Sequence, residues 1–105
     1  MAISITSANY QQEVVQSEIP VIVDVFAVWC GPCHHMKPIF ESLEKEFVGI
    51  YKFATLDVEE DRQLSIDLGI TSIPTFLFFK NGILVGKEVG SLSADRFKDQ
   101  LKKYF

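Results

Sequence analysis

Apolar residues along this chain fall into two kinds of segment: continuous runs, and longer stretches in which they return every three or four positions. Two runs predict strands, Val21 to Val28, which is interrupted only by Asp24 and should be buried on both faces, and Tyr51 to Val58. Between them, helical spacing predicts a helix from about Cys33 to Phe47, with a candidate kink at Pro38. The residues that carry this spacing are Met36, Ile39, Phe40, Leu43 and Phe47. A strand, a helix and a strand in this order favour a right-handed parallel crossover.

The second half of the chain predicts a hairpin followed by a helix. Thr75 to Lys80 and Ile83 to Val89 read as antiparallel strands, joined by Asn81-Gly82 in a tight primed turn. A last helix is expected to begin after Ser93 as N-cap, with one apolar face formed by Phe97, Leu101 and Tyr104.

A strand near Ile3 to Ile5 and a helix near Ala8 to Gln16 complete a β-α-β-α-β-α-β-β-α order. This order predicts an α/β fold with a mixed sheet flanked by helices. Val21 to Val28 would be a central strand, and the sequence that follows it would lie at its carboxyl end, where open α/β sheets keep their sites.

Composition narrows the class of protein. With 105 residues and 48% hydrophobic content, the chain is expected to form one domain that buries a core without cross-links. A net charge of -4 argues against nucleic acid or an anionic membrane surface as partner. The first residues lack a basic and an apolar region of a leader, and no stretch has the length of a membrane span, so a cytoplasmic location is expected.

The only two cysteines, Cys30 and Cys33, lie between the central strand and the following helix. Residues three apart on a helix have Cβ atoms about 5–6 Å apart, so a small local adjustment closes a disulfide. If the helix begins near Cys30, its unpaired N–H groups favour the nucleophilic thiolate of that residue. Pro32 is tolerated in a first turn and Gly31 leaves the sulfur uncrowded, whereas Cys33 should be more shielded. In a reducing compartment such a pair is typical of catalysis or metal binding.

Asp24 is the one ionisable residue in the central strand. An ionised carboxylate buried without a partner costs several kcal/mol, so the pKa of Asp24 should be raised. The alternative is that Asp24 lies at a solvated edge of the sheet, or bonds backbone groups, and has no chemical role.

Five separate motifs together resemble the thioredoxin family from end to end. They are Val23-Asp24, Trp29-Cys30-Gly31-Pro32-Cys33, Ile73-Pro74-Thr75, Phe79-Lys80-Asn81-Gly82 and Val89-Gly90. The resemblance implies a single thioredoxin domain over residues 1–105, with a mixed five-stranded sheet flanked by helices.

The resemblance also implies dithiol exchange with oxidised protein substrates. Cys30 would attack a substrate disulfide, and Cys33 would attack the resulting mixed disulfide and release the reduced substrate. A thioredoxin reductase would then reduce the Cys30–Cys33 pair. No cofactor is expected on this chain, which has no glycine-rich dinucleotide motif. In the family, the aspartate that matches Asp24 helps to deprotonate the resolving cysteine, so Asp24 is predicted to act as general base for Cys33, directly or through water.

The chain departs from many relatives beside this aspartate. They carry a lysine on the neighbouring strand where this sequence has Thr55, and Lys52 should face the other side of that strand. Without a nearby cation, the carboxyl group of Asp24 should be protonated more often than theirs. Proton transfer here is therefore expected to depend more on pH.

His34 and His35 directly follow the cysteine pair. Cys30 to His34 satisfies the C-x-x-C-H pattern of c-type haem attachment, and two cysteines with two histidines also suggest zinc. The flanking strand and helix leave no haem pocket, and no second ligand cluster exists for structural zinc. We therefore interpret both as surface histidines, with His34 as a weak, pH-dependent positive neighbour of Cys30 where many relatives have a lysine.

The resemblance favours a cis bond between Ile73 and Pro74, which would hold that loop against the sulfurs and let the Ile73 backbone pair with an extended substrate. Together with Trp29, Gly31, Pro32 and Gly90, this loop would form an apolar docking patch. Val28 would enlarge the apolar rim in place of the family's usual acidic residue, and Phe26 would serve core packing.

The leading hypothesis is a cytoplasmic, monomeric protein-disulfide reductase. A rival with the same chemistry is an oxidase or isomerase, which usually has another dipeptide between the cysteines than Gly31-Pro32. A rival of another class is a binding subunit in which the patch around Trp29 serves assembly and the thiols are incidental.

Overall fold

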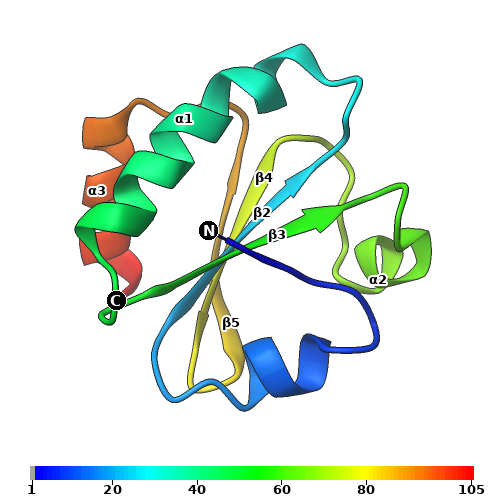
Figure 1. Ribbon diagram of the computed structural model, residues 1–105, viewed down its shortest axis with the longest axis horizontal. Helices are drawn as coiled ribbons and strands as arrows, with labels where there is room; N and C mark the ends of the chain where they lie inside the picture. Colours follow the sequence, from blue (N-terminus) through cyan, green and yellow to red (C-terminus); the bar gives the residue numbers. More distant parts are fainter. Residues whose placement is uncertain (1) are drawn as a thin grey trace.

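Strand β2 (Val21–Phe26) is the middle strand of a five-stranded sheet in the computed structural model, which describes residues 2–105 (Figure 1). The strand order is β1-β3-β2-β4-β5. The other strands are β1 (Ile3–Ser4), β3 (Lys52–Asp57), β4 (Thr75–Lys80) and β5 (Ile83–Val89). β2 pairs in parallel with β3 and antiparallel with β4, so the predicted mixed sheet is confirmed.

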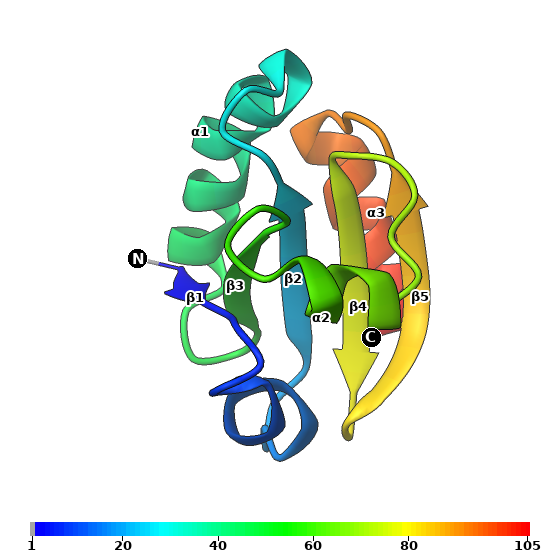
Figure 2. The same cartoon turned by 90° about the vertical axis from the view of Figure 1, so that its right-hand side faces the viewer.

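Helices cover both faces of the sheet (Figure 2). α1 (Gly31–Glu46) and α3 (Ala94–Tyr104) pack on one face, and a short π-helical segment η1 (Gln11–Val15) and α2 (Arg62–Asp67) pack on the other. Alternate residues of β2 serve the two layers: Val23 joins the core under η1 and α2, whereas Ile22 joins the core under α1 and α3. Asp24, two residues after Ile22, therefore belongs to the face that α1 covers.

Phenylalanine rings fill the layer between the sheet and helices α1 and α3. Phe76 and Phe97 have ring centroids 5.0 Å apart, and Phe40 and Phe53 have theirs 5.1 Å apart, both pairs edge to face. This layer holds a cavity near the amino end of α1, lined among others by Cys33 and Phe40. None of the helices formed by residues 2–105 has the length and apolar character needed to span a bilayer.

The hairpin and the last helix form as the local sequence predicts. Asn81 and Gly82 have φ of 54° and 76°, so both turn residues have the positive φ that a primed turn requires. Ser93 caps α3 by accepting a hydrogen bond from the N–H of Arg96 at 3.2 Å. The Phe97 and Leu101 side chains are fully buried, which confirms the predicted apolar face.

Several predicted boundaries were wrong by one to three residues. β2 ends at Phe26 because a turn follows, and α1 begins two residues before Cys33, since Cys30 already caps it. β1 and β3 are one or two residues shorter than predicted. In place of the helix over residues 8–16 there is only the π-helical segment, and α1 continues as a helix through Pro38.

Candidate active site

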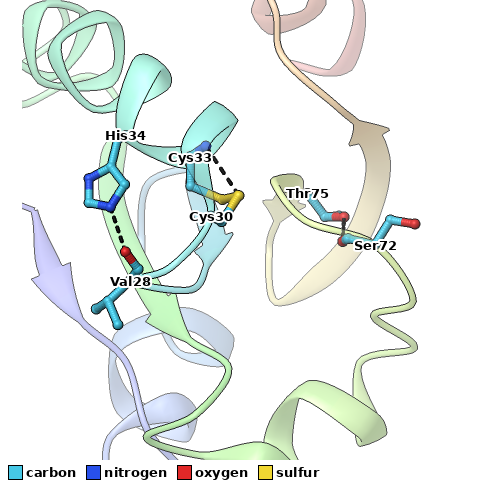
Figure 3. The surroundings of a disulfide bond; sticks show 6 residues. All are labelled: Val28, Cys30, Cys33, His34, Ser72 and Thr75. Atoms are coloured by element: carbon cyan, nitrogen blue, oxygen red, sulfur yellow. Dashed lines mark hydrogen bonds between the residues drawn. A yellow bond between two sulfur atoms is a disulfide. The ribbon is translucent and has the colours of Figure 1, made fainter.

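The cysteine pair lies between the end of β2 and the first turn of α1, at the carboxyl end of the central strand (Figure 3). Cys30 has extended backbone angles and is the N-cap of α1. Its Sγ accepts a hydrogen bond from the N–H of Cys33 at 3.2 Å, so a sulfur takes the place that a Ser or Asp oxygen takes at most helix starts. Pro32 follows in the first turn, where its missing N–H would find no partner within the helix. The sulfur of Cys30 therefore lies against the positive end of the helix dipole.

Cys30 and Cys33 form a disulfide, with Cα atoms 5.3 Å apart. This distance lies within the range that disulfides require, so the pair closes without rearrangement of the helix. The expectation that Cys33 is the more shielded receives little support in this oxidised state, because the exposed fractions are 6% for Cys30 and 5% for Cys33. Each sulfur covers the other while the bond is closed. Nothing within 4 Å would meet a Cβ on Gly31, so the space beside this residue is open as expected.

Asp24 is buried behind the pair. Only 5% of the residue is exposed, and its Oδ1 has no hydrogen-bond partner among residues 2–105. Burial removes the carboxylate from water and raises the pKa of Asp24 to about 7, as the sequence predicted. The alternative of a solvated edge position is wrong, because β2 has a paired strand on each side.

A cavity of about 330 Å³ connects Asp24 with the resolving side of the pair, because both Asp24 and Cys33 line it. Thr55 lines it as well and is the register neighbour of Asp24 on β3, as expected from the sequence. Lys52 points to the opposite face of the sheet, where its Nζ lies 3.1 Å from a carboxylate oxygen of Glu13. β3 therefore supplies no cation to Asp24. The other residues around the cavity are Ala2, Phe26, Ala27, Val28, His34, Lys37, Phe40 and Glu41.

Part of the predicted docking patch lies against the cysteine pair. The Ile73–Pro74 bond is cis, and Ile73 packs against the buried cluster that contains both cysteines. Pro74 is buried, and its carbonyl accepts a hydrogen bond from the N–H of Gly90 at 2.8 Å. Gly90 has a φ of 95°, which favours glycine. Gly31 and Pro32, which lie between the two cysteines in the chain, are exposed.

Trp29 forms the wall of a second, outer hollow of about 330 Å³. Its side chain stays open to solvent, with 68% of the residue exposed. The aliphatic residues of this hollow are Val58, Ile66, Ile70 and Ile73, and its charged residues are Glu59 and Arg62. Exposed apolar surface of this kind is typical of a binding site.

His34 and His35 are both exposed, as expected, but His34 has a specific partner. Its Nε2 donates a hydrogen bond to the carbonyl of Val28 at 2.5 Å, which ties the first turn of α1 to the loop that carries Trp29 (Figure 3). Within the described part of the chain, residues 2–105, no three His, Cys, Asp or Glu side chains come close enough together to hold a metal ion.

Sequence reasoning missed Lys37, Glu41 and the α2 side of the Trp29 hollow. A signal for the first two exists: Cys33, Lys37 and Glu41 follow one another at intervals of four, so they lie on one stripe of α1. The contribution of Ile66 had no such signal, because the sequence did not fix the bounds of α2.

Comparison with known proteins agrees with this geometry. The thioredoxin family profile matches residues 1–103. A thioredoxin of Rickettsia felis is 35% identical over 103 residues, which cover 98% of each chain. The chain belongs to the thioredoxin family.

Other thioredoxins match at similar levels. Thioredoxin 1 of a Nostoc species is 34% identical over 103 residues, 98% of this chain and 96% of that one. The chloroplastic M-type thioredoxin of Pisum sativum is 37% identical over 100 residues, 95% of this chain and 58% of that one. The mixed sheet with its flanking helices is thus the thioredoxin fold, and the chain is a thiol-disulfide oxidoreductase with Cys30–Cys33 as its redox-active disulfide.

Proposed function

We propose that Cys30 is the attacking thiol and Cys33 the resolving thiol of this protein-disulfide reductase. The observation that carries the proposal is the position of the Cys30 sulfur as N-cap of α1, a helix of 16 residues. The backbone N–H groups of the first turn stabilise negative charge on this atom. Cys33 lies within the helix and lines the buried cavity instead.

The reaction begins with the reduced pair. The Cys30 thiolate attacks one sulfur of a substrate disulfide, forms a mixed disulfide and expels the second substrate sulfur as a thiolate, which takes up a proton. Cys33 then loses its proton, and its thiolate attacks Sγ of Cys30 and expels the first substrate sulfur, which is also protonated. Two electrons and two protons have passed to the substrate. A thioredoxin reductase then supplies two electrons and two protons to the Cys30–Cys33 disulfide and restores the dithiol.

Asp24 is proposed as the group that takes the proton from Cys33. Both residues line the same cavity, which has room for a bridging water, and the unpartnered Oδ1 of Asp24 can accept the proton. Burial raises the pKa of Asp24 to about 7, so near neutral pH the carboxyl group can both accept and release a proton.

Substrate docking is proposed for the outer side, at Trp29, Gly31, Pro32, Ile73, Pro74 and Gly90. An indole that is two-thirds exposed beside a reactive pair offers apolar area without a large loss of side-chain entropy. The half-buried Ile73 at the cis bond can offer its backbone to an extended substrate segment.

We further propose that residues 1–105 act as one domain and a monomer in the cytoplasm, on oxidised proteins rather than on nucleic acid or membranes. The acidic composition, with a net charge of -4, supports the exclusion of polyanionic partners.

The test is reduction of insulin disulfides with a thioredoxin reductase and NADPH. Cys30→Ser should abolish reduction and leave the fold intact, because a serine oxygen caps the helix as well as sulfur does. Cys33→Ser should accumulate a mixed disulfide that mass spectrometry detects. Wild-type reduction by Cys30→Ser would contradict the proposal, as would labelling of both reduced thiols by iodoacetamide at equal rates. A wild-type protein that reduces no insulin would favour the binding subunit.

A further inference from the structure

The cavity behind Cys33 has a buried carboxyl group at one end and two opposite charges beside it. Asp24 lies at the sheet, with its Oδ1 unpartnered. Lys37 and Glu41 line the same cavity from α1, where both side chains are exposed. They lie one turn apart on the stripe that begins at Cys33, so the helix that carries the resolving sulfur also carries these charges.

The remaining elements around Asp24 bring few charges to it. From β3 comes Thr55, from β4 the register neighbour is Phe76, and from the amino-terminal segment comes Ala2, none of which has an ionisable side chain. On α1, His34 also lines the cavity, but its Nε2 is engaged by the carbonyl of Val28.

Two charged residues elsewhere on this face of the sheet have other partners. Asp57 on β3 accepts a hydrogen bond from the N–H of Glu59 at 2.9 Å. Glu88 on β5 accepts one from the hydroxyl of Tyr104. Among residues 2–105, Lys37 and Glu41 are thus the charged groups of fixed sign that line the cavity with Asp24.

We propose that Lys37 and Glu41 are positioning residues that set, with opposite signs, the pH at which Asp24 ionises. Lys37 favours the carboxylate and Glu41 disfavours it. Lys37 has no hydrogen bond or ion pair with another of residues 2–105, so its long side chain can turn toward the cavity when Asp24 loses its proton. The consequence for disulfide exchange rests on the proposed role of Asp24 as proton acceptor: the pair would fix the pH range in which the mixed disulfide resolves.

Because the cavity lining is largely apolar, the effect of Lys37 and Glu41 on the titration of Asp24 should be large enough to measure. Phe26, Ala27, Val28 and Phe40 surround the carboxyl group with apolar atoms, so water screens a charge at the rim less than it would at an open surface. Removal of one rim charge should shift the midpoint of the Asp24 titration by about 0.5–1 pH unit. Burial is the dominant influence on the pKa of Asp24 in the intact chain. Because the two rim charges have opposite signs, we expect their effects on Asp24 to offset each other when both are present.

The experiment follows the carboxyl carbon of Asp24 by NMR against pH in the oxidised protein, in which the cysteines do not titrate. Lys37→Met should raise the midpoint, and Glu41→Gln should lower it. In Lys37→Arg, Asp24 should titrate as in the wild-type protein, since this substitution keeps the positive charge. Lys45→Met is the matched control: it removes the same charge from the same helix, but Lys45 does not line this cavity.

Shifts in the same direction, or shifts no larger than that of Lys45→Met, would overturn the inference. The proposed function is tested separately by measuring, with stopped flow over the same pH range, how fast the substrate is released from the mixed disulfide. If the Asp24 titration moves in the two variants while the pH profile of release stays unchanged, then the inference holds and the role of Asp24 in exchange fails. If Asp24→Asn slows release but neither rim variant moves the titration, the role stands and the inference fails.

Discussion

Two hollows of equal volume, about 330 Å³ each, differ in what they keep from water. The inner one is lined by α1 and the outer one by α2, helices that cover opposite faces of the sheet. The inner one buries the carboxyl group of Asp24, and the outer one leaves the indole of Trp29 exposed. Each arrangement goes against the usual preference of its side chain, since burial of a carboxylate and exposure of an aromatic ring both cost free energy. The comparison fits the two tasks proposed above, proton transfer in the inner hollow and substrate docking at the outer one.

The largest effect is expected from Asp24→Asn on the release of the mixed disulfide. An amide cannot accept the proton of Cys33, and loss of general base catalysis slows such a step by about 10²–10⁴-fold. Formation of the mixed disulfide depends on Cys30 and should keep its rate. Stopped-flow measurements on a labelled disulfide substrate separate the two steps. Equal slowing of both would show that the inner hollow has no special part in resolution.

Asp24→Asn should also change how stability depends on pH. The pKa of Asp24 is 3.8 in the unfolded chain and about 7 in the folded one, so the folded protein holds more protons between these values. The contribution of Asp24 to stability is therefore most favourable at low pH and is lost as the pH rises through this window.

An asparagine does not ionise, so it does not lose stability as the pH rises. Asp24→Asn should therefore increase the free energy of unfolding more at pH 8 than at pH 4, by up to about 4 kcal/mol. Denaturant titrations of the oxidised wild-type protein and of the variant at both pH values measure this difference. The same gain at both pH values would mean that Asp24 does not ionise inside the fold with a raised pKa.

A smaller effect is expected from Trp29→Ala, which removes the wall of the outer hollow. KM for protein substrates should rise about tenfold, because a central aromatic anchor is worth more than about 1 kcal/mol in binding. Reduction of a small aromatic disulfide should change little. Val48→Ala is the matched control, since Val48 is also strongly exposed but lies in neither hollow. An equal rise in KM in Val48→Ala would contradict a specific docking role for Trp29.

Local sequence signals account for much of the fold. The apolar run around Asp24 predicted the central strand, Asn81-Gly82 predicted the primed turn, and Ser93 predicted the start of α3, because each depends on neighbours in the chain. The apolar spacing placed the start of α1 at about Cys33. The structure has instead the start near Cys30 on which stabilisation of the thiolate depends, with a sulfur in place of the usual capping oxygen.

The site could be predicted only as far as its motifs reached. The cysteine pair, the buried Asp24 and the absence of a cation at Thr55 could be read from the sequence. The position of Lys37 at the cavity could not be predicted from the sequence, because the cavity forms only when α1, β2 and β3 pack together. The nearly equal burial of Cys30 and Cys33 likewise reflects the closed disulfide, a state that the sequence does not specify.

β2 has a hydrogen-bonded strand along each of its sides, whereas Trp29, Ile73 and Gly90 all stand on connecting segments outside the strands and helices. Mutations in those connections are therefore expected to leave the hydrogen-bonded pairing of the middle strand in place. The same three residues belong to the motifs by which this chain resembles its family, so function, rather than sheet pairing, is expected to restrain change in these connections.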